Sequence, residues 1–436
     1  MVILVLISMS LSLLLCHLKS KILSKKHGRA PKHHGDVTSL CPENPIEIEK
    51  ALISQTNKRH VDFNGCEILG AIHGGKFGTT IFKVSDGLIW KQYKGSNKQR
   101  FFNERDVYEI LKQSSSTDVK EEPSLFLNYF GSHESSTDDT NNSHQWIICL
   151  ELASKGSLAS YLKPNTLSWA QTCAMLIDIS KGLSQLHNVY GLVHRQLNST
   201  NILIRGGLEG GRDDGLLHCC IGDFGQACSF DSSNIIGNYY YDYSNRDDPL
   251  EKDDDDGMIT PDSIRYQAPE VLDGLFNLSW TQADVYSLGL LFWELSLRCH
   301  ELYQGVEVPP FQLAYQKEIG LKPSHEQMKI LVMKNKARPL FPEVWKNSNP
   351  AIQQLKETIM DSWDHDGEAR LTSSCVVERV RELGNLWEHY KLVSAGPPIL
   401  DLVQPNNTQP RHEAKITTYF TNILNEEASS MSKHSK

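Results

Sequence analysis

The hydrophobic positions of this 436-residue chain change their spacing about a third of the way along it. The runs EILGAIHGGKFGTTIFKV and LIWKQY are short and separated by glycine turns, which predicts strands. QRFFNERDVYEILKQ has helical periodicity, and HQWIICLEL is typical of a buried strand. After these runs, WAQTCAMLIDISKGLSQLH and ADVYSLGLLFWELSLR predict helices. The pattern therefore predicts an α+β protein, with a small strand-rich part containing one helix followed by a larger helical part.

An apolar segment opens the sequence, and a strongly basic segment follows it. Residues 1–18 have only small polar interruptions, close to the lower limit of roughly 18 residues for a membrane span. The positive-inside rule then places the chain from Lys19 onward in the cytoplasm. A cleaved signal peptide is the alternative, but it needs basic residues before the apolar run and small residues at a cleavage site. We predict a single-pass membrane anchor at 1–18 and a basic juxtamembrane linker at 19–62.

Composition limits the function classes. A hydrophobic fraction of 39% and a charged fraction of 22% are ordinary for a globular protein with a core. The net charge of −9 argues against a general nucleic-acid-binding protein. The cysteines show no CxxC pair, which favours free thiols in a reducing compartment over a disulfide framework or a zinc site. Residues 132–144 and 205–215 are predicted to be exposed loops, and residues 395–436 a polar disordered tail.

One lysine in the strand-rich part has the surroundings of a buried charge. Lys91 follows an apolar run and stands beside Trp90, so it is expected to be partly buried. A buried ammonium needs a partner of opposite charge. Glu104 lies 13 residues on, at the start of the predicted helix, and can reach back to the strand. The two are predicted to form an ion pair.

Four polar motifs follow in the second part of the chain. They are HRQLNSTN at 194–201, IGDFGQA at 221–227, YQAPEVL at 266–272 and GEARLT at 367–372. Each motif alone is weak, and their order and spacing carry the information. A glycine-rich turn at residues 74–78 precedes them, and such a turn lets backbone approach a phosphate closely, although it can equally be a plain hairpin.

With these motifs in this order, the chain resembles a eukaryotic protein kinase domain over about residues 66–390. More closely, it resembles the intracellular part of transforming-growth-factor-β superfamily type II receptors, in particular the bone-morphogenetic-protein branch. The most specific stretches are SIRYQAPEVLDG, GLLFWELSLRC, ARPLFPEVWK and LKETIMDSWDHDGEARLTSSCVVERV. That family carries a small disulfide-rich ectodomain before its membrane span, so this sequence is either a shortened receptor or part of a longer one.

The resemblance implies a bilobal protein-kinase-like fold, with a β-rich N-lobe at 66–152 and a helical C-lobe at 156–390. It implies ATP and Mg²⁺ as cofactors, with Mn²⁺ as an alternative metal. The residues that it assigns to ATP are Gly75, Phe77, Gly78, Lys91, Glu104, Glu151, Ala153 and Leu203. Asn201 and Asp223 are assigned to the metal. The first glycine of the family's loop is replaced by His73, which weakens the expected grip on phosphate.

The resemblance also assigns catalytic and structural roles. Gln196 stands at the catalytic-base position, where the family has aspartate, and Asn198 stands where a lysine commonly reaches the γ-phosphate. The structural residues are His194, Arg195, Glu270, Asp284 and Arg370. Among these, Glu270 and Arg370 are expected to form a buried pair, and Asp284 to brace the catalytic loop.

Gln196 changes the expected chemistry at one step. An amide cannot take up a proton at neutral pH, although its carbonyl oxygen can still accept a hydrogen bond. General-base help is worth ~10²–10⁴ in rate. Kinases turn over at roughly 1–100 s⁻¹, so ~10⁻⁴–1 s⁻¹ would remain if everything else were intact. ATP binding is therefore expected to survive better than phosphotransfer.

Three functions remain open from the sequence. The first is a type II receptor serine/threonine kinase that signals in a membrane hetero-oligomer with a type I receptor. The second is a pseudokinase receptor or decoy, which acts as a binding module without phosphorylating its partner. The third is a soluble scaffold with a kinase fold. The acidic stretch at 247–256 reads as a solvated loop, or alternatively as a permanent substitute for phosphorylation that pairs with basic residues near Arg195.

Overall fold

The computed structural model describes residues 63, 66–74, 79–114, 124–135, 145–206, 217–229, 261–275, 279–346 and 349–394, which all belong to a compact unit beginning at Lys58. The predicted anchor at 1–18, the linker at 19–62, the acidic stretch at 247–256 and the tail at 395–436 lie outside these residues. Gly75, Phe77 and Gly78 of the glycine loop also lie outside them. No helix within the described ranges is long and apolar enough to cross a membrane.

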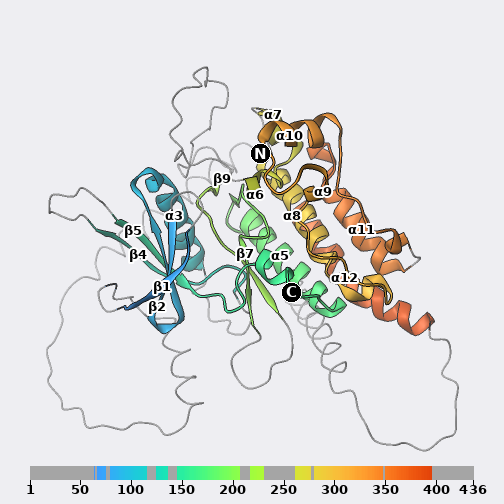
Figure 1. The fold of residues 1–436 in the computed structure, drawn as a ribbon, viewed down its shortest axis with the longest axis horizontal. Helices are drawn as coiled ribbons and strands as arrows, with labels where there is room; N and C mark the ends of the chain where they lie inside the picture. The colour runs from blue at the N-terminus through green and yellow to red at the C-terminus, as the bar shows by residue number, and fades with distance from the viewer. Residues whose placement is uncertain are drawn as a thin grey trace, which may run out of the picture. The chain divides into compact units, whose positions relative to one another are not determined.

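An antiparallel five-stranded sheet, in the order β1-β2-β3-β5-β4, forms the first part of the fold (Figure 1). Its strands are β1 (Ile68–Gly74), β2 (Thr79–Val84), β3 (Leu88–Tyr93), β4 (Tyr129–Ser135) and β5 (Gln145–Glu151). β3 is central, with Lys91 opposite Ile81 of β2 and Ile148 of β5. The lysine therefore sits in the middle of the sheet, where the strands on both sides fix its position.

The two faces of β3 have different surroundings, because successive side chains of a strand point to opposite faces. On one face, a small buried cluster contains Val84, Trp90, Ile147 and Cys149. On the other face, Lys91 and Tyr93 meet helix α3 (Lys98–Ser114). The alternation thus directs Lys91 to the helix and Trp90 away from it.

Helix α3 buries one side against the sheet and the centre of the molecule. The buried apolar residues of this side are Phe101, Val107, Tyr108 and Leu111. Residues four apart lie on the same side of a helix, one turn above each other. Arg100 and Glu104 therefore share the buried side, and both are less than a tenth exposed.

The second part of the fold is helical. Its longer helices are α5 (Trp169–Asn188), α8 (Trp280–Ser296), α11 (Pro350–Ser362) and α12 (Ser373–Ser394). α12 packs against α5 and α11, and α11 also packs against α8 (Figure 1). The short helices are α4 (Leu158–Leu162), α6 (Pro261–Ile264), α7 (Pro269–Asp273), α9 (Gln316–Ile319) and α10 (His325–Met328), with single turns at Ser85–Gly87, Gly95–Asn97, His300–Tyr303, Lys329–Lys334, Glu343–Lys346 and Gly367–Ala369.

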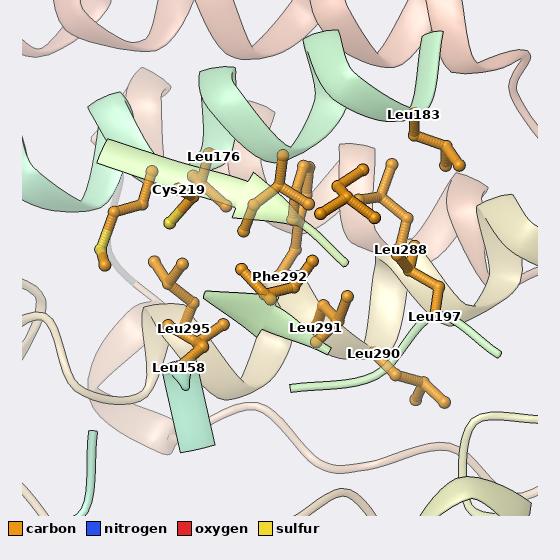
Figure 2. Close-up of a cluster of buried hydrophobic side chains, with 14 of the residues drawn as sticks. Leu158, Leu176, Leu183, Leu197, Cys219, Leu288, Leu290, Leu291, Phe292 and Leu295 are labelled. Atoms are coloured by element: carbon orange, nitrogen blue, oxygen red, sulfur yellow. The ribbon is translucent and has the colours of Figure 1, made fainter. Parts of the chain in front are cut away.

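The core of the helical part is built around α5 and α8. Every residue of α8 from Ala283 to Ser296 is buried, including the carboxyl groups of Asp284 and Glu294. Figure 2 shows leucines of α5 and α8 gathered with Leu197 and with Cys219. Leu197 belongs to the HRQLNSTN segment and is 1% exposed. The core therefore anchors this polar segment from inside.

Local sequence signals explain where several helices begin. Ser168 and Gln171 form a reciprocal capping box at the start of α5. At α11, the Asn349 side chain accepts a hydrogen bond from the Ala351 amide, and Pro350 occupies the first turn. These caps satisfy amide groups that have no partner inside the helix.

Two short strand pairs frame the polar motifs. β6 (Leu192–Val193) pairs with β9 (Cys228–Ser229), and β7 (Ile202–Arg205) pairs with β8 (His218–Ile221). The segment 194–201 joins β6 to β7, and the segment 222–227 joins β8 to β9. Since both segments begin where a buried strand ends, the two strand pairs bring them side by side.

The predicted α+β class is confirmed, with a strand-rich first lobe and a helical second lobe. Helix α12 runs to Ser394, beyond the predicted end of the domain at 390. The cysteines that the structure describes are free thiols.

Candidate active site

A buried ion-pair network joins the sheet, helix α3 and the segment after β8. Lys91 Nζ lies 2.7 Å from Glu104 Oε2 and 2.8 Å from Asp223 Oδ1. The Tyr93 hydroxyl also donates to Glu104 Oε2. Burial by itself would lower the pKa of Lys91, but the Asp223 and Glu104 carboxylates outweigh it and raise that pKa above its ordinary value. Lys91 is therefore charged, and it holds two carboxylates from distant parts of the chain.

Asp223 is held as a carboxylate. Burial would raise its pKa, but the Lys91 ammonium and then the Arg100 guanidinium hold the pKa of this carboxyl well below its ordinary value. Its backbone has a φ of 64°, in the left-handed region that residues other than glycine seldom adopt. This conformation is maintained by the contacts of its neighbour Phe224, which is fully buried.

A column of aromatic rings fixes Phe224 between the two lobes. Its ring centroid lies 5.4 Å from that of His194 and 5.1 Å from that of Tyr108 on α3. Tyr108 in turn stacks on Tyr129 of β4, with centroids 5.5 Å apart. The column connects the HRQLNSTN segment to the sheet through α3. It keeps α3 close enough for Glu104 to reach Lys91.

Asp284 of α8 organises the start of the HRQLNSTN segment. Its two oxygens accept hydrogen bonds from the His194 amide at 2.7 Å and the Arg195 amide at 2.8 Å. Arg195 has a φ of 63°, so the carboxylate holds the backbone in a strained turn. His194 Nδ1 accepts from the Gln196 amide at 3.2 Å, so Nε2 carries the proton and donates to the Gly222 carbonyl at 3.1 Å. Asp284 thus holds the start of the segment 194–201 through both of its oxygens.

Gln196 projects toward Arg100, a cation outside the predicted motifs. Arg100 Nη2 donates to Gln196 Oε1 at 3.2 Å, and the same nitrogen lies 3.8 Å from Asp223 Oδ1. The sequence does contain a signal for this position of Arg100. Arg100 precedes Glu104 by one helical turn, which places the two side chains on the same side of α3. The catalytic-base position therefore holds a neutral amide that accepts a hydrogen bond from a guanidinium.

Asn198 and Asn201 donate to the same carbonyl but differ in where their side-chain oxygens lie. Asn201 Nδ2 donates to the Gln196 carbonyl at 2.9 Å, which turns its side-chain oxygen to the other side. Asn198 Nδ2 donates to the same carbonyl at 2.9 Å, and its Oδ1 accepts from the Thr200 amide at 2.9 Å. Asn198 is 3% exposed. These bonds hold Asn198 within the loop and do not favour the predicted contact with a γ-phosphate.

The predicted adenine-contacting residues lie around the end of β5. Arg205 Nε donates to Glu151 Oε1 at 2.7 Å, and Asn128 Nδ2 donates to Glu151 Oε2 at 2.7 Å. Ala153 is buried, and Leu203 is half-buried on β7. The ion pair of Glu151 with Arg205 joins the sheet to the helical lobe at this point. In the backbone of residues 151–153, the Glu151 amide donates to the Asn128 carbonyl at 3.0 Å and the Leu152 amide donates to the Gly87 carbonyl at 3.0 Å. The Ala153 carbonyl accepts from the Gly156 amide at 3.1 Å, so the adenine contact stays a prediction.

Glu270 and Arg370 form the pair that the sequence analysis expected. Arg370 Nη1 and Nη2 each donate to a different oxygen of Glu270 at 2.7 Å. Arg370 also donates to the Asp364 carbonyl at 2.9 Å and to the Gln282 carbonyl at 3.0 Å. Its side chain is fully buried, whereas that of Glu270 is 16% exposed. This arrangement ties α7 to the turn before α12.

Arg195 makes its contacts within the helical lobe. Its guanidinium lies 4.3 Å from the ring centroid of Trp280, and Nη1 lies 3.8 Å from Cys228 Sγ. The hypothesis that the acidic stretch 247–256 pairs near Arg195 stays a prediction, since that stretch lies outside the described residues.

A buried carboxyl group supports the loop from below. Glu294 accepts hydrogen bonds from the Tyr266 hydroxyl at 2.8 Å and from the Ala314 amide at 2.7 Å. The Tyr266 hydroxyl also lies 2.8 Å from the Ser199 hydroxyl. Burial raises the pKa of Glu294 from 4.5 to about 7, although its hydrogen bonds act in the opposite direction. The network thus links the catalytic loop to α8 through a carboxyl that titrates near neutrality.

Stability should depend on pH through Glu294. Its pKa is higher in the folded chain than in the unfolded one, so its contribution is complete below pH 4.5 and is lost as the pH rises through about 7. In wild type we expect the free energy of unfolding to decline by about 3 kcal/mol between pH 4.5 and about 7. In Glu294→Gln this decline should be absent. Urea unfolding of the full chain at a series of pH values measures the difference. Glu357→Gln on the exposed side of α11 is the control, and equal pH profiles for Glu294→Gln and wild type would contradict the prediction.

The predicted metal ligands supply suitable oxygens, but their surroundings do not suit a divalent cation. Asn201 offers its side-chain oxygen and Asp223 its carboxylate, both of which Mg²⁺ prefers. The positions beside Asp223 Oδ1 are taken by Lys91 at 2.8 Å and Arg100 at 3.8 Å. A dication next to these two cations would be repelled. The fit to Mg²⁺ is therefore incomplete because of Arg100.

Comparison with known proteins yields one family match and several relatives. The family model described as protein tyrosine and serine/threonine kinase matches residues 135–380. Activin receptor type-2A from Xenopus laevis is 31% identical over 319 residues, which cover 70% of this chain and 52% of the receptor. Anti-Muellerian hormone type-2 receptor from Homo sapiens is 33% identical over 264 residues, which cover 58% of this chain and 43% of the receptor. The chain spans about half the length of the curated relatives it matches.

Proposed function

Since this chain belongs to the protein tyrosine and serine/threonine kinase family, we propose that it is a membrane receptor serine/threonine kinase of the type II class that binds ATP but transfers phosphate poorly. Two of its relatives are type-2 receptors, for activin and for anti-Muellerian hormone. They support the superfamily predicted from the sequence, while the bone-morphogenetic-protein branch rests on the sequence motifs alone. The single-pass anchor at 1–18 would leave the kinase domain in the cytoplasm.

The observation that carries this proposal is the contrast between Lys91 and Gln196. Lys91 is charged, buried and aligned by Glu104, which is the arrangement that grips the α- and β-phosphates of ATP in kinases. Gln196 stands where a carboxylate would accept the proton of the substrate hydroxyl, and an amide cannot accept it. This contrast supports nucleotide binding without efficient proton acceptance.

In this proposal the chain acts in ligand-dependent signalling beside a type I receptor of the same superfamily. The type I receptor would be both its partner in a hetero-oligomer and its phosphorylation substrate. The type-2 receptor relatives support this partner. The acidic net charge gives no support to a nucleic-acid partner.

The contact between Arg100 and Gln196 favours a second candidate, a pseudokinase receptor or decoy. At 3.2 Å the guanidinium takes one of the two hydrogen-bond positions of the Gln196 oxygen, so a substrate hydroxyl would have to share that oxygen with a cation. Such a chain would act as a binding module that occupies partner complexes without phosphorylating them. Both candidates share the nucleotide pocket and differ in the phosphotransfer rate.

Replacing Lys91 by alanine tests the shared pocket. We expect Lys91→Ala to weaken binding of a fluorescent ATP analogue by ~10–100-fold, because a charge-assisted contact with phosphate is worth roughly 1.5–3 kcal/mol. The full chain in detergent is titrated with the analogue, and unlabelled ATP confirms competition.

Lys83→Ala on the neighbouring strand is the matched control, since Lys83 is exposed. Its affinity for the analogue should equal that of wild type. If Lys91→Ala and Lys83→Ala bind the analogue equally well, or wild type does not bind it at all, the ATP pocket is wrongly assigned.

A further inference from the structure

Arg100 of helix α3 lies where that helix meets the segments 194–201 and 222–227. It is 6% exposed, and its guanidinium lies between the Gln196 amide and the Asp223 carboxylate at the distances given above. Its side chain packs closely on Gly225, where an added Cβ would stand 3.2 Å from Arg100 Nε. The Arg100 side chain is therefore held by contacts inside the protein and does not lie on its surface.

The ion pairs described above contain equal numbers of positive and negative charges. In these pairs, Lys91 and Arg100 contribute two positive charges, while Glu104 and Asp223 contribute two negative ones. An aspartate at position 196 would add a third negative charge beside Arg100, whereas Gln196 adds none. A buried group of charges is stable when its members are paired. The neutral residue at 196 and the cation at 100 thus fit each other.

A divalent cation would disturb this balance. Mg²⁺ between Asn201 and Asp223 would stand beside a guanidinium that cannot lose its proton. A nucleoside triphosphate would instead bring phosphate oxygens, which are acceptors that a planar guanidinium can bind with two parallel hydrogen bonds. Arg100 is already directed toward the carboxylate that would hold the metal.

We propose that the Arg100 guanidinium takes the place of a divalent cation beside Asp223, so that a nucleoside triphosphate binds the chain without metal. Arg100 is then a phosphate-binding residue, together with Lys91. This inference rests on the proposed nucleotide binding and adds the way in which the phosphate charge is neutralised. It also means that divalent metal gives little gain in nucleotide affinity.

The test measures ATP binding to the full chain with and without divalent metal. A fluorescent ATP analogue is titrated in EDTA and again in millimolar MgCl₂, with unlabelled ATP as competitor. For wild type we expect dissociation constants that agree within about threefold in the two buffers. For Arg100→Gln we expect binding in EDTA to weaken by ~10–100-fold, since a charge-assisted bond to phosphate is lost. Added MgCl₂ should restore most of this loss, because the position of the cation is then open.

Two further variants keep the result interpretable. Arg105→Gln removes a guanidinium from the same helix, where it pairs with its neighbour Asp106 at a partly exposed site, and should match wild type in both buffers. Arg100→Lys keeps the positive charge and should retain binding in EDTA to within about tenfold. If Arg100→Gln fails to fold, Arg100→Lys is measured in its place.

The possible failures are distinguishable. Wild type that binds the analogue only in MgCl₂, or Arg100→Gln that binds like wild type in EDTA, would overturn the role of Arg100 and leave nucleotide binding intact. Absence of binding by wild type in both buffers would overturn the nucleotide pocket itself, and with it this inference.

Discussion

The double variant Gln196→Asp with Arg100→Gln should transfer phosphate ~10²–10⁴-fold faster than wild type, which is the usual worth of a general base. Aspartate restores the proton acceptor at the catalytic position. Removing Arg100 frees that aspartate from an ion pair and opens the place beside Asp223 for a metal ion. The measurement is transfer of labelled phosphate from ATP to the juxtamembrane serines of a type I receptor, in MgCl₂.

The single variants separate the two effects. In Gln196→Asp alone, the new carboxylate would stand beside Arg100, whose Nη2 is 3.2 Å from the present amide oxygen. The resulting ion pair lowers the basicity of the carboxylate, so its gain should be at least tenfold smaller than that of the double variant. Arg100→Gln alone should gain little, because position 196 would still lack a base. Wild type that already turns over at roughly 1–100 s⁻¹, the range of ordinary kinases, would refute impaired catalysis and the pseudokinase alternative together.

Arg370→Ala should lower the free energy of unfolding by about 3–5 kcal/mol, the cost of breaking a buried ion pair by removing one partner. The Glu270 carboxylate would lose both of its hydrogen bonds from Arg370, and the carbonyls of Asp364 and Gln282 would each lose a donor. A domain is stable by only about 5–15 kcal/mol. Urea unfolding of the full chain, followed by tryptophan fluorescence, measures the change.

Arg379→Ala is the matched control for this prediction. Arg379 also forms an ion pair, with Asp361 at 2.6 Å, but both side chains are about a third exposed or more. A surface pair contributes about 1 kcal/mol or less. Similar losses for the two variants would show that burial of the Glu270–Arg370 pair has no special weight. If Arg370→Ala does not fold, Arg370→Lys provides the measurable case, since a lysine keeps the charge and loses the two-pronged contact.

The predictions that succeeded depended on local pattern and on motif order. The predicted runs form β1, β2, β3, β5 and α3, and the α+β class is confirmed. Strand β4 is absent from the predicted elements, and the assignment of its residues 132–135 to an exposed loop is wrong because they pair with β5. Lys91 meets Glu104, and Glu270 meets Arg370. The roles of these residues in binding ATP or in stabilising the domain remain proposals that the variants above address.

The prediction that fits the structure least well concerns Asn198. Its position in the motif indicated a phosphate contact, but its side chain forms hydrogen bonds to Gln196 and Thr200 within the loop. Motif position does not reveal this, because a short amide side chain in a tight turn prefers nearby backbone partners. The weak fit of the metal ligands has a similar origin, since it depends on a residue outside every motif.

By itself, the sequence determined the class of the fold, the family and the position, Gln196, at which the chain departs from the kinase motif. These follow from periodicity and from motifs whose residues are close together along the chain. Only the tertiary structure decided what surrounds Gln196. Arg100 and Gln196 are 96 residues apart, and Lys91 and Asp223 are 132 apart. Whether such groups meet depends on the packing of α3 against the segments that carry Gln196 and Asp223. The arrangement of charges around Arg100 follows from that packing.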